Sequence, residues 1–408
     1  MIKKDLHVHL HGCLSAEDLW NIGKDNYKQQ DGMLNWFALE YQKAWGRTPN
    51  FKQYWESENG YDLLREDYIF DKTNNFDRFQ ANFNLIVALC PIGAENFDIQ
   101  ERIIRNTDKE KLEYFEARTL IPFRLDEKQV EKYLQGLCLK VKELNAGLNM
   151  QTRLVFSLFR DNGLALKHYK QLRDFIASYP DLGSVISGVD FAFAEEGSPP
   201  KSKIEFCKQF HLDNKSQQPL NLLYHVGESF EDKGIISAIR WIWEAHELGA
   251  TRLGHAIALG VNPENYHGKK VSEPISERLD TINWLMANQE ILKENGYTPD
   301  VVNLRKEEQT INDLGSSSID ITYDDSYVED CKSLQIAIAN IFREKRVIIE
   351  TCPTSNLRIG QVTKPSFHPL KFFHDHGLQY VTCTDDPGIF NIDWHSEYRL
   401  AQEIIETI

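Results

Sequence analysis

Eight short apolar or alternating runs follow one another along the chain, and amphipathic stretches of helical length separate most of them. Regular alternation of strands with helices is the signature of a parallel sheet, and eight such units are what a (β/α)8 barrel requires. We therefore predict an α/β fold, a TIM barrel. Its predicted strands are residues 5–10, 112–119, 153–159, 185–191, 222–226, 252–259, 347–351 and 378–384, and its predicted helices include residues 130–144, 168–178, 234–248 and 333–343.

Two connections, approximately residues 15–109 and 260–344, are too long to be ordinary barrel loops. Both carry helical patterns of their own, and the first is rich in aromatic residues. Both follow the C-terminal end of a predicted strand, so we expect them over the face where a barrel carries its active site. We predict a single barrel domain over residues 1–408 with two insertions. The insertions could serve as lids or as subunit contacts in an oligomer, and the sequence leaves both open.

Charge and cysteine content narrow the class of partner. A formal net charge of −15 argues against a binder of nucleic-acid polymers, because non-specific phosphate binding needs clustered Lys and Arg. A small-molecule substrate is expected instead. The seven cysteines form no C-x-x-C pair, which indicates free thiols in a reducing compartment, and we find neither a signal segment nor a membrane span. We expect a cytoplasmic protein with no membrane partner.

Histidines and carboxylates stand at the ends of several predicted strands. His7 and His9 are one residue apart on the first strand, so both imidazoles should point into the barrel, where they could chelate a metal. Taken alone, the pair is also typical of a polar strand end with solvated histidines. His225 ends the fifth predicted strand, and Glu228 follows it as a proton donor or acceptor. Glu228 could instead favour the start of the next helix.

Two further segments complete this set. His255 follows a glycine in the sixth predicted strand, where a hydrogen-bonded structural histidine is the common alternative. Asp385 and Asp386 follow the eighth predicted strand and could divide labour between a cation and a polar substrate atom, although Asp-Asp-Pro-Gly is also a good turn. The carboxyl ends of parallel strands meet at one face of a barrel, so the segments together indicate a metal-dependent hydrolase.

Taken together, the motifs resemble those of the adenosine deaminase family, broadly the adenosine, adenine and AMP deaminases of the metal-dependent amidohydrolase superfamily. The likeness covers residues 1–13 and most of 110–395, but not the two insertions. The matching segments occur in the family's order, and they are Asp5-Leu-His-Val-His-Leu-His-Gly, Tyr114-Phe-Glu-Ala-Arg, Gly188-Val-Asp-Phe-Ala, His225-Val-Gly-Glu, Arg252-Leu-Gly-His, Glu350-Thr-Cys-Pro-Thr-Ser-Asn and Thr384-Asp-Asp-Pro.

The resemblance implies a role for each residue at the predicted strand ends. One divalent metal, usually zinc, would be bound by His7, His9, His225 and Asp385 and would activate water for attack at C6 of a purine. Glu228 would be the acid that protonates the ring nitrogen, and His255 would orient the attacking oxygen. Asp386 would hold the purine through N7, and ammonia would leave.

Two departures from the family pattern affect substrate recognition. His11 stands where adenosine deaminases have an acidic residue for the sugar hydroxyl, and it could bind a hydroxyl or, when protonated, face a phosphate. Phe193 replaces a small residue whose backbone would contact the base. We expect His11 and Phe193 to contact the substrate, together with Asp386 and Gly188. The chain ends soon after Asp385, so either residues 394–407 form a single closing helix or the chain is a fragment.

The resemblance implies hydrolytic deamination of an adenine nucleoside or nucleotide, a reaction of purine metabolism. Two alternatives remain: a metal-dependent amidohydrolase with another substrate, and a deaminase-like subunit of a larger assembly. The presence of Glu228, His255 and Asp386 argues against a non-catalytic relative, which would be expected to lose some of them. The sequence does not choose among adenosine, deoxyadenosine, adenine, AMP, ATP and N6-substituted purines.

Overall fold

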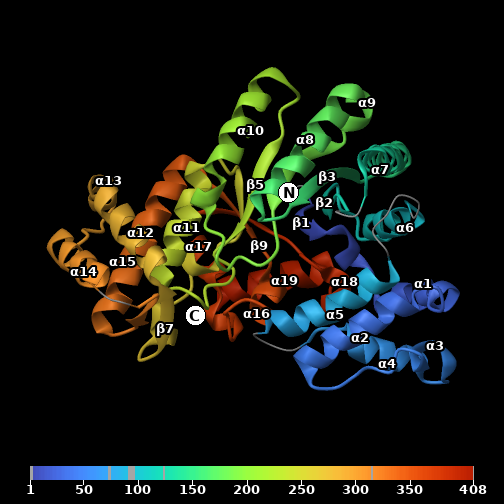
Figure 1. Cartoon of the computed structure of the whole chain (residues 1–408), viewed down its shortest axis with the longest axis horizontal. Helices are drawn as coiled ribbons and strands as arrows, with labels where there is room; N and C mark the ends of the chain where they lie inside the picture. The colour runs from blue at the N-terminus through green and yellow to red at the C-terminus, as the bar shows by residue number, and fades with distance from the viewer. Residues whose placement is uncertain (1–2, 72–74, 91–96, 123–124, 314–315, 408) are drawn as a thin grey trace.

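A barrel of eight parallel strands forms the centre of the protein (Figure 1). The computed structural model describes residues 3–71, 75–90, 97–122, 125–313 and 316–407. The sheet order is β1-β2-β3-β4-β5-β6-β9-β10, and the barrel closes where Val8 of β1 pairs with Asp385 beyond β10. The predicted TIM barrel is therefore confirmed. The barrel strands are β1 Lys4–His9, β2 Tyr114–Leu120, β3 Gln151–Leu158, β4 Ile186–Phe191, β5 Asn221–Val226, β6 Arg252–His255, β9 Ile348–Thr351 and β10 Gln379–Thr382.

Helices connect the strands and cover the outside of the barrel. Helix α7 illustrates why these helices form. It begins with a capping box between Asp126 and Gln129, and its buried residues recur at helical spacing from Val130 to Leu144. The four predicted helices lie at α7, α8, α11 and α15. The barrel helices are α6 Phe97–Asp108, α7 Glu127–Gly147, α8 Asn162–Ser178, α9 Pro180–Gly183, η2 Pro200–Lys203, α10 Ile204–Ser216, α11 Ile235–Glu247, α15 Asp325–Lys345, α16 Pro353–Arg358, η5 Pro365–Phe367, α17 Pro369–Asp375, α18 Pro387–Phe390 and α19 Trp394–Glu406.

The sixth strand is shorter than the predicted run 252–259. It ends at His255, because His255 and Ala256 adopt φ values of +62° and +47°, which turn the chain out of the sheet. Residues Ile257–Leu259 then form the 3-10 helix η3. An apolar run alone does not reveal this break, since both segments are buried.

The first long connection forms a helical layer on one side of the barrel, drawn in blue in Figure 1. A buried carboxylate helps to hold this layer together, since Asp67 accepts hydrogen bonds from the hydroxyls of Tyr41 (3.1 Å) and Tyr54 (2.6 Å). The last helix, α5, packs against α2 and lies near the mouth of the barrel. The elements of this layer are η1 Leu10–Cys13, α1 Ala16–Asn26, α2 Asp31–Trp45, α3 Gln53–Glu56, α4 Gly60–Tyr68 and α5 Phe76–Leu89.

The second long connection lies on the opposite side of the barrel (Figure 1). It contains a two-stranded antiparallel sheet, β7 with β8, that the sequence analysis did not predict. The connection comprises η4 Pro263–Tyr266, β7 Lys270–Pro274, α12 Ile275–Ala287, α13 Gln289–Glu294, α14 Val301–Asp313 and β8 Ser318–Thr322. Among the described residues, no helix combines the length and apolar character needed to cross a membrane.

Candidate active site

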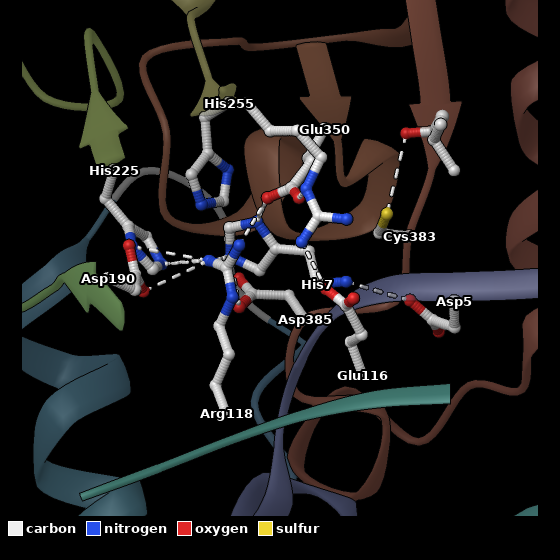
Figure 2. Close-up of polar contacts among 12 residues, drawn as sticks. Asp5, His7, Glu116, Arg118, Asp190, His225, His255, Glu350, Cys383 and Asp385 are labelled. Atoms are coloured by element: carbon white, nitrogen blue, oxygen red, sulfur yellow. Dashed lines mark hydrogen bonds and ion pairs between the residues drawn. The ribbon is translucent and has the colours of Figure 1, made fainter. Parts of the chain in front are cut away.

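Three segments bring four potential metal ligands to the carboxyl end of the barrel. His7 and His9 come from β1, His225 comes from β5, and Asp385 follows β10. The side chain of His7 is fully buried, whereas 27% of the His9 side chain remains exposed toward the barrel mouth. Figure 2 shows His7, His225 and Asp385 directed toward one another at the barrel axis. The structure therefore gathers the four predicted ligands in one place.

The ligand atoms of these four side chains all lie within 4.8 Å of one another. His7 Nε2 is 2.9 Å from His225 Nε2, and Asp385 Oδ1 is 3.3 Å from His9 Nε2 and 3.6 Å from His7 Nε2. Three imidazole nitrogens and one carboxylate oxygen form a donor set that suits zinc. Asp385 Oδ1 is buried and has no directed hydrogen bond among the described residues, which leaves its lone pairs available for a cation.

Two carboxylates behind the ligands orient the imidazole rings. His7 Nδ1 lies 3.1 Å from Glu350 Oε2, and His225 Nδ1 lies 2.9 Å from Asp190 Oδ2. A ring N–H that donates to a carboxylate through Nδ1 leaves the Nε2 lone pair facing the centre of the cluster. This arrangement, drawn in Figure 2, is the outer hydrogen bonding that metal-bound histidines usually have. The residues present therefore fit a divalent metal.

Arg118 of β2 balances the buried negative charge beside the histidines. Its guanidinium forms ion pairs with Asp190 (3.4 Å) and Glu350, and its Nη1 lies 2.8 Å from His7 Nε2. Arg252 contributes a second cation, with Nε 2.7 Å from Glu350 Oε1. A charge buried in this way is tolerated only when it is paired, so Arg118 and the two carboxylates depend on one another.

The electrostatic environment keeps two of the imidazoles neutral. Burial and the nearby Arg118 cation lower the pKa of His7 well below its ordinary value. Burial likewise lowers the pKa of His225 to about 3, although the Asp190 carboxylate opposes this change. His9 differs, because the Asp386 and Asp385 carboxylates outweigh its burial and raise its pKa to about 9. His9 Nε2 and Asp385 Oδ1, 3.3 Å apart, are two of the atoms that would bind a divalent cation.

A second donor set overlaps the first. His7, His255, Cys352 and Asp385 also have ligand atoms within 4.8 Å of one another, and all four residues are buried. The two sets share His7 and Asp385, so they describe alternative ways to hold a cation at the same place. The geometry of the donor atoms alone does not choose between them.

The loop after β5 holds Glu228 at the edge of the ligand cluster. Glu195 is buried and accepts the backbone N–H groups of Gly227 at 2.8 Å and Glu228 at 3.1 Å, which fixes this loop. Glu228 Oε1 lies 3.6 Å from His255 Nε2. Burial, with the Asp385 and Glu195 charges, raises the pKa of Glu228 to about 7, despite the opposing His255. Such a carboxyl group can both give and take a proton near neutral pH.

Asp386 is buried next to Asp385 and has a tightly confined position. Burial and the Asp385 charge raise the pKa of Asp386 well above its ordinary range, which favours the protonated form of this carboxyl group. A Cβ atom on Gly12 would overlap Asp386 Oδ1, so only glycine fits at position 12. Asp386 Oδ1 has no hydrogen-bond partner among the described residues. It is therefore free to bind a ligand.

A cavity of about 210 Å³ lies above these groups. One wall is the apolar face of α5, and another is Phe193, which stacks on Phe159 with ring centroids 4.3 Å apart. His11 also lines the cavity and is 8% exposed, and burial lowers its pKa to about 4. The described residues of the second insertion do not contribute to the lining. The α5 residues that line the cavity are Phe76, Phe79, Gln80, Phe83, Ile86 and Val87.

Gly188 is the one expected substrate contact that lies elsewhere. It pairs with Val155 and Asn221 near the start of β4, away from the carboxyl ends of the strands, and it is not among the residues that line the cavity. A Cβ atom there would lie 2.6 Å from Asn221 O. Close packing of neighbouring strands therefore accounts for this glycine, and we no longer expect it to bind substrate.

Several residues of the site were not given roles from the sequence. Arg118, Asp190 and Glu350 neutralise and orient the ligands, Glu195 holds the Glu228 loop, and the Asn356 amide lies 2.9 Å from His255 Nδ1. Four of them lie in the segments that matched the family motifs. The fifth, Glu195, lies outside those segments, and its only indication in the sequence is an acidic residue just after the fourth predicted strand.

Comparison with known proteins agrees with this geometry. The family model for adenosine deaminase matches residues 307–406. An adenosine deaminase of Pseudoalteromonas translucida is 40% identical over 408 residues, which covers 97% of this chain and 86% of the relative. Among solved structures, an arabidopsis N6-mAMP deaminase superposes with a TM-score of 0.57 at 15% identity, covering 100% of this chain and 89% of that one.

A second solved structure shares the barrel. It is an amidohydrolase from Burkhoderia ambifaria with bound Zn, with a TM-score of 0.56 at 10% identity, covering 100% of this chain and 81% of the other. At such low identity these two structures establish only the fold. The adenosine deaminase of Pseudoalteromonas translucida, at 40% identity, establishes the family. The chain belongs to the adenosine deaminase family, and it is a hydrolase that acts on the C–N bond of adenine compounds.

Proposed function

We propose that this protein is a zinc-dependent deaminase that converts an adenosine-type nucleoside to the inosine-type product and ammonia. One observation carries the proposal: the predicted metal ligands His9, His225 and Asp385 line the same cavity as Glu228 and Asp386, and the fourth predicted ligand, His7, has its ligand atom within 4.8 Å of theirs. The α5 wall of that cavity is apolar, as a purine ring requires.

The metal would be held by three imidazoles and one carboxylate, and His9, whose pKa is raised to about 9, would lose its proton when the metal binds. When bound, zinc supplies the Lewis acidity that makes a water molecule nucleophilic near neutral pH. The proposal of zinc rests on the nitrogen-rich donor set and on the zinc reported for the amidohydrolase of the same fold. The burial that keeps His7 and His225 unprotonated serves the same end, because a protonated imidazole cannot bind a cation.

Three side chains would handle the protons of the reaction. Asp386, whose pKa is raised by burial and by the Asp385 charge, donates the O–H of its protonated form to purine N7. Glu228, whose pKa is about 7, donates a proton to the ring nitrogen N1 as water oxygen attacks C6, and regains a proton from that water. Glu228 then gives its proton to the C6 amine and takes the proton of the C6 hydroxyl, so that the C6–N bond breaks, the amine leaves as ammonia, and C6 becomes a carbonyl carbon. His255 lies beside Glu228, with Nε2 3.6 Å from Glu228 Oε1, and would orient the attacking oxygen.

The charges around the cavity favour a nucleoside over a nucleotide. Among the described lining residues, Arg118 is the only lysine or arginine, and its guanidinium is already paired with Asp190 and Glu350. His11 has its pKa lowered to about 4 by burial, so it is neutral at pH 7 and can hydrogen-bond a sugar hydroxyl but offers a phosphate no charge. A phosphate group would therefore be bound without a cationic partner.

The test is release of ammonia by zinc-loaded protein from adenosine, deoxyadenosine, adenine, AMP and N6-methyl-AMP, with a chelated sample as control. We expect kcat/KM for adenosine to exceed that for AMP by at least roughly a hundredfold, which corresponds to about 2.7 kcal/mol for the unpaired phosphate. Preference for AMP would contradict the nucleoside assignment. Absence of ammonia from every purine would contradict the deaminase assignment itself.

A further inference from the structure

A buried chain of polar side chains runs from His255 away from the cavity. Asn356 of α16 lies between two imidazoles, 2.9 Å from His255 Nδ1 and 3.1 Å from His368 Nε2. All three residues are at most 3% exposed. At the far end, the backbone N–H of Leu370 donates to His368 Nδ1 at 3.0 Å, where His368 caps the start of α17. The mechanism above gives His368 no role.

The protonation of His368 follows from its surroundings. Its Nδ1 accepts the Leu370 N–H, whose direction is set by the backbone of α17, so Nδ1 carries no proton. Burial lowers the pKa of His368 to about 3, so the ring is neutral and has one proton. That proton must therefore be on Nε2, which makes His368 a donor toward Asn356.

The Asn356 amide must accept this proton with its oxygen. In the structure Asn356 Nδ2 faces His368 Nε2, which would set two donors against each other. Rotation of the amide by 180° exchanges oxygen and nitrogen with almost no change of shape, because the two groups have the same size. After this rotation Oδ1 accepts from His368, and Nδ2 faces His255 Nδ1 and donates to it. His255 Nδ1 then carries no proton.

We propose that His368, acting through Asn356, fixes the tautomer of His255 with its proton on Nε2, which points into the active site. This proton faces the space beside Glu228 Oε1, 3.6 Å away, and His255 Nε2 has no hydrogen-bond partner within the described chain. His255 is then a hydrogen-bond donor to the attacking oxygen and not a base. Under the proposed function, Glu228 is left as the group that moves protons.

The same tautomer selects between the two overlapping donor sets. A metal-bound nitrogen needs its lone pair, so an Nε2 that carries a proton cannot be a ligand. His255 therefore does not bind the cation, and the set with Cys352 is excluded in favour of His7, His9, His225 and Asp385. Asn356 and His368 are positioning residues, since both act on the reaction only through His255.

The direct test is ¹⁵N NMR of zinc-loaded protein labelled at histidine. The chain has 13 histidines, so the His255 signals are identified by their loss in His255→Gln. We expect the His255 Nδ1 resonance in the range of an unprotonated ring nitrogen and the Nε2 resonance in the range of a protonated one. The reverse pattern, or a His255 nitrogen shifted by metal, would overturn the proposal. This result does not depend on any substrate, so it stands apart from the test of the proposed function.

Variants test the relay through its two positioning residues. The carboxylate introduced by Asn356→Asp can only accept hydrogen bonds, so this variant should reverse the His255 tautomer. Its kcat should fall by roughly 10²- to 10³-fold, as expected when a hydrogen-bond donor to the developing charge is lost. His368→Met removes the donor to Asn356 and should lower kcat roughly tenfold, whereas His368→Gln keeps a donor and should restore most of it. Asn149→Asp adds the same charge in an exposed loop at the other end of the barrel and serves as control.

The variants are read by NMR, zinc content and kinetics together. The proposal requires that Asn356→Asp keeps its zinc, reverses the two His255 resonances and loses kcat more than it raises KM. Wild-type kcat in Asn356→Asp would overturn the catalytic part, and an unchanged His255 tautomer would overturn the relay. If Asn356→Asp does not fold, His368→Met with wild-type His255 resonances overturns the relay instead.

Discussion

Replacement of Glu228 by glutamine should change activity and stability in opposite directions. The wild-type carboxyl has a pKa of about 7 because it is buried beside Asp385 and Glu195. Glutamine keeps the shape of the protonated side chain but cannot transfer a proton. We expect kcat to fall at least roughly a hundredfold while zinc content is retained, because a positioned acid or base contributes about 10²- to 10⁴-fold.

The stability gain follows from the same pKa. The group is raised from 4.5 to about 7, so the folded state holds its proton more tightly than the unfolded chain does, and wild-type stability is lost as pH rises through this window. The loss is about 1 kcal/mol at pH 5 and about 3 kcal/mol at pH 8, since each tenfold change in proton affinity is about 1.4 kcal/mol. Glu228→Gln avoids this loss and should be more stable by that amount.

Urea unfolding of metal-free wild-type protein and Glu228→Gln at pH 5 and pH 8 measures the difference. The exposed Glu231 lies in the same loop, and Glu231→Gln is the matched control, for which we expect no pH-dependent gain. Equal gains for Glu228→Gln at both pH values would refute the argument that burial raises its pKa. Full activity in the same variant would refute its role as the acid.

Three further perturbations test the geometry of the site. Gly12→Ala should lower kcat/KM for adenosine at least about tenfold, a loss of 1.4 kcal/mol, because its Cβ would displace Asp386; normal kinetics would contradict this packing. Cys352→Ser should bind zinc with unchanged affinity in a chelator competition, whereas loss of zinc would favour the donor set that contains Cys352. Removal of zinc should lower the unfolding temperature reversibly, with about 2.7 kcal/mol recovered when free zinc reaches a hundred times its Kd; scanning calorimetry with and without chelator measures this.

The barrel was predictable because its signal is repeated. Each strand is a short buried run between longer amphipathic stretches, and eight such units allow few other arrangements. The antiparallel pair of β7 and β8 was missed for the opposite reason: Lys270–Pro274 contains lysine, serine and glutamate, and only Glu273 of this strand is buried. Its partner Ser318–Thr322 does alternate Ile319 and Ile321 with polar residues, but the run has only five residues and only Ile321 is buried, so its signal is weak.

The ligands of the candidate metal site could be predicted because histidine and aspartate at strand ends stand out in an apolar run. The groups behind them could not be assigned a partner, since sequence does not reveal which distant charges are neighbours. Arg118 and Glu350, for example, are separated by 232 positions and meet only because β2 and β9 face the same barrel axis. Gly188 was predicted to contact the substrate because it lies in a family motif. In the structure, close packing of β4 against β5 accounts for this glycine.

Backbone strain gathers at the same strand ends and suggests why they carry function. Phe193, His255 and Asp385 have φ values of +73°, +62° and +61°, in the left-handed region that disfavours side chains by about 1–2 kcal/mol each. Each lies at or just beyond the end of a barrel strand, and each lines the cavity. Together they oppose folding by about 3–6 kcal/mol, a large share of a typical net stability. Glycine would relieve this strain at each position but would remove the ring, imidazole or carboxylate, so the retained side chains indicate that these three positions serve the site and not the fold.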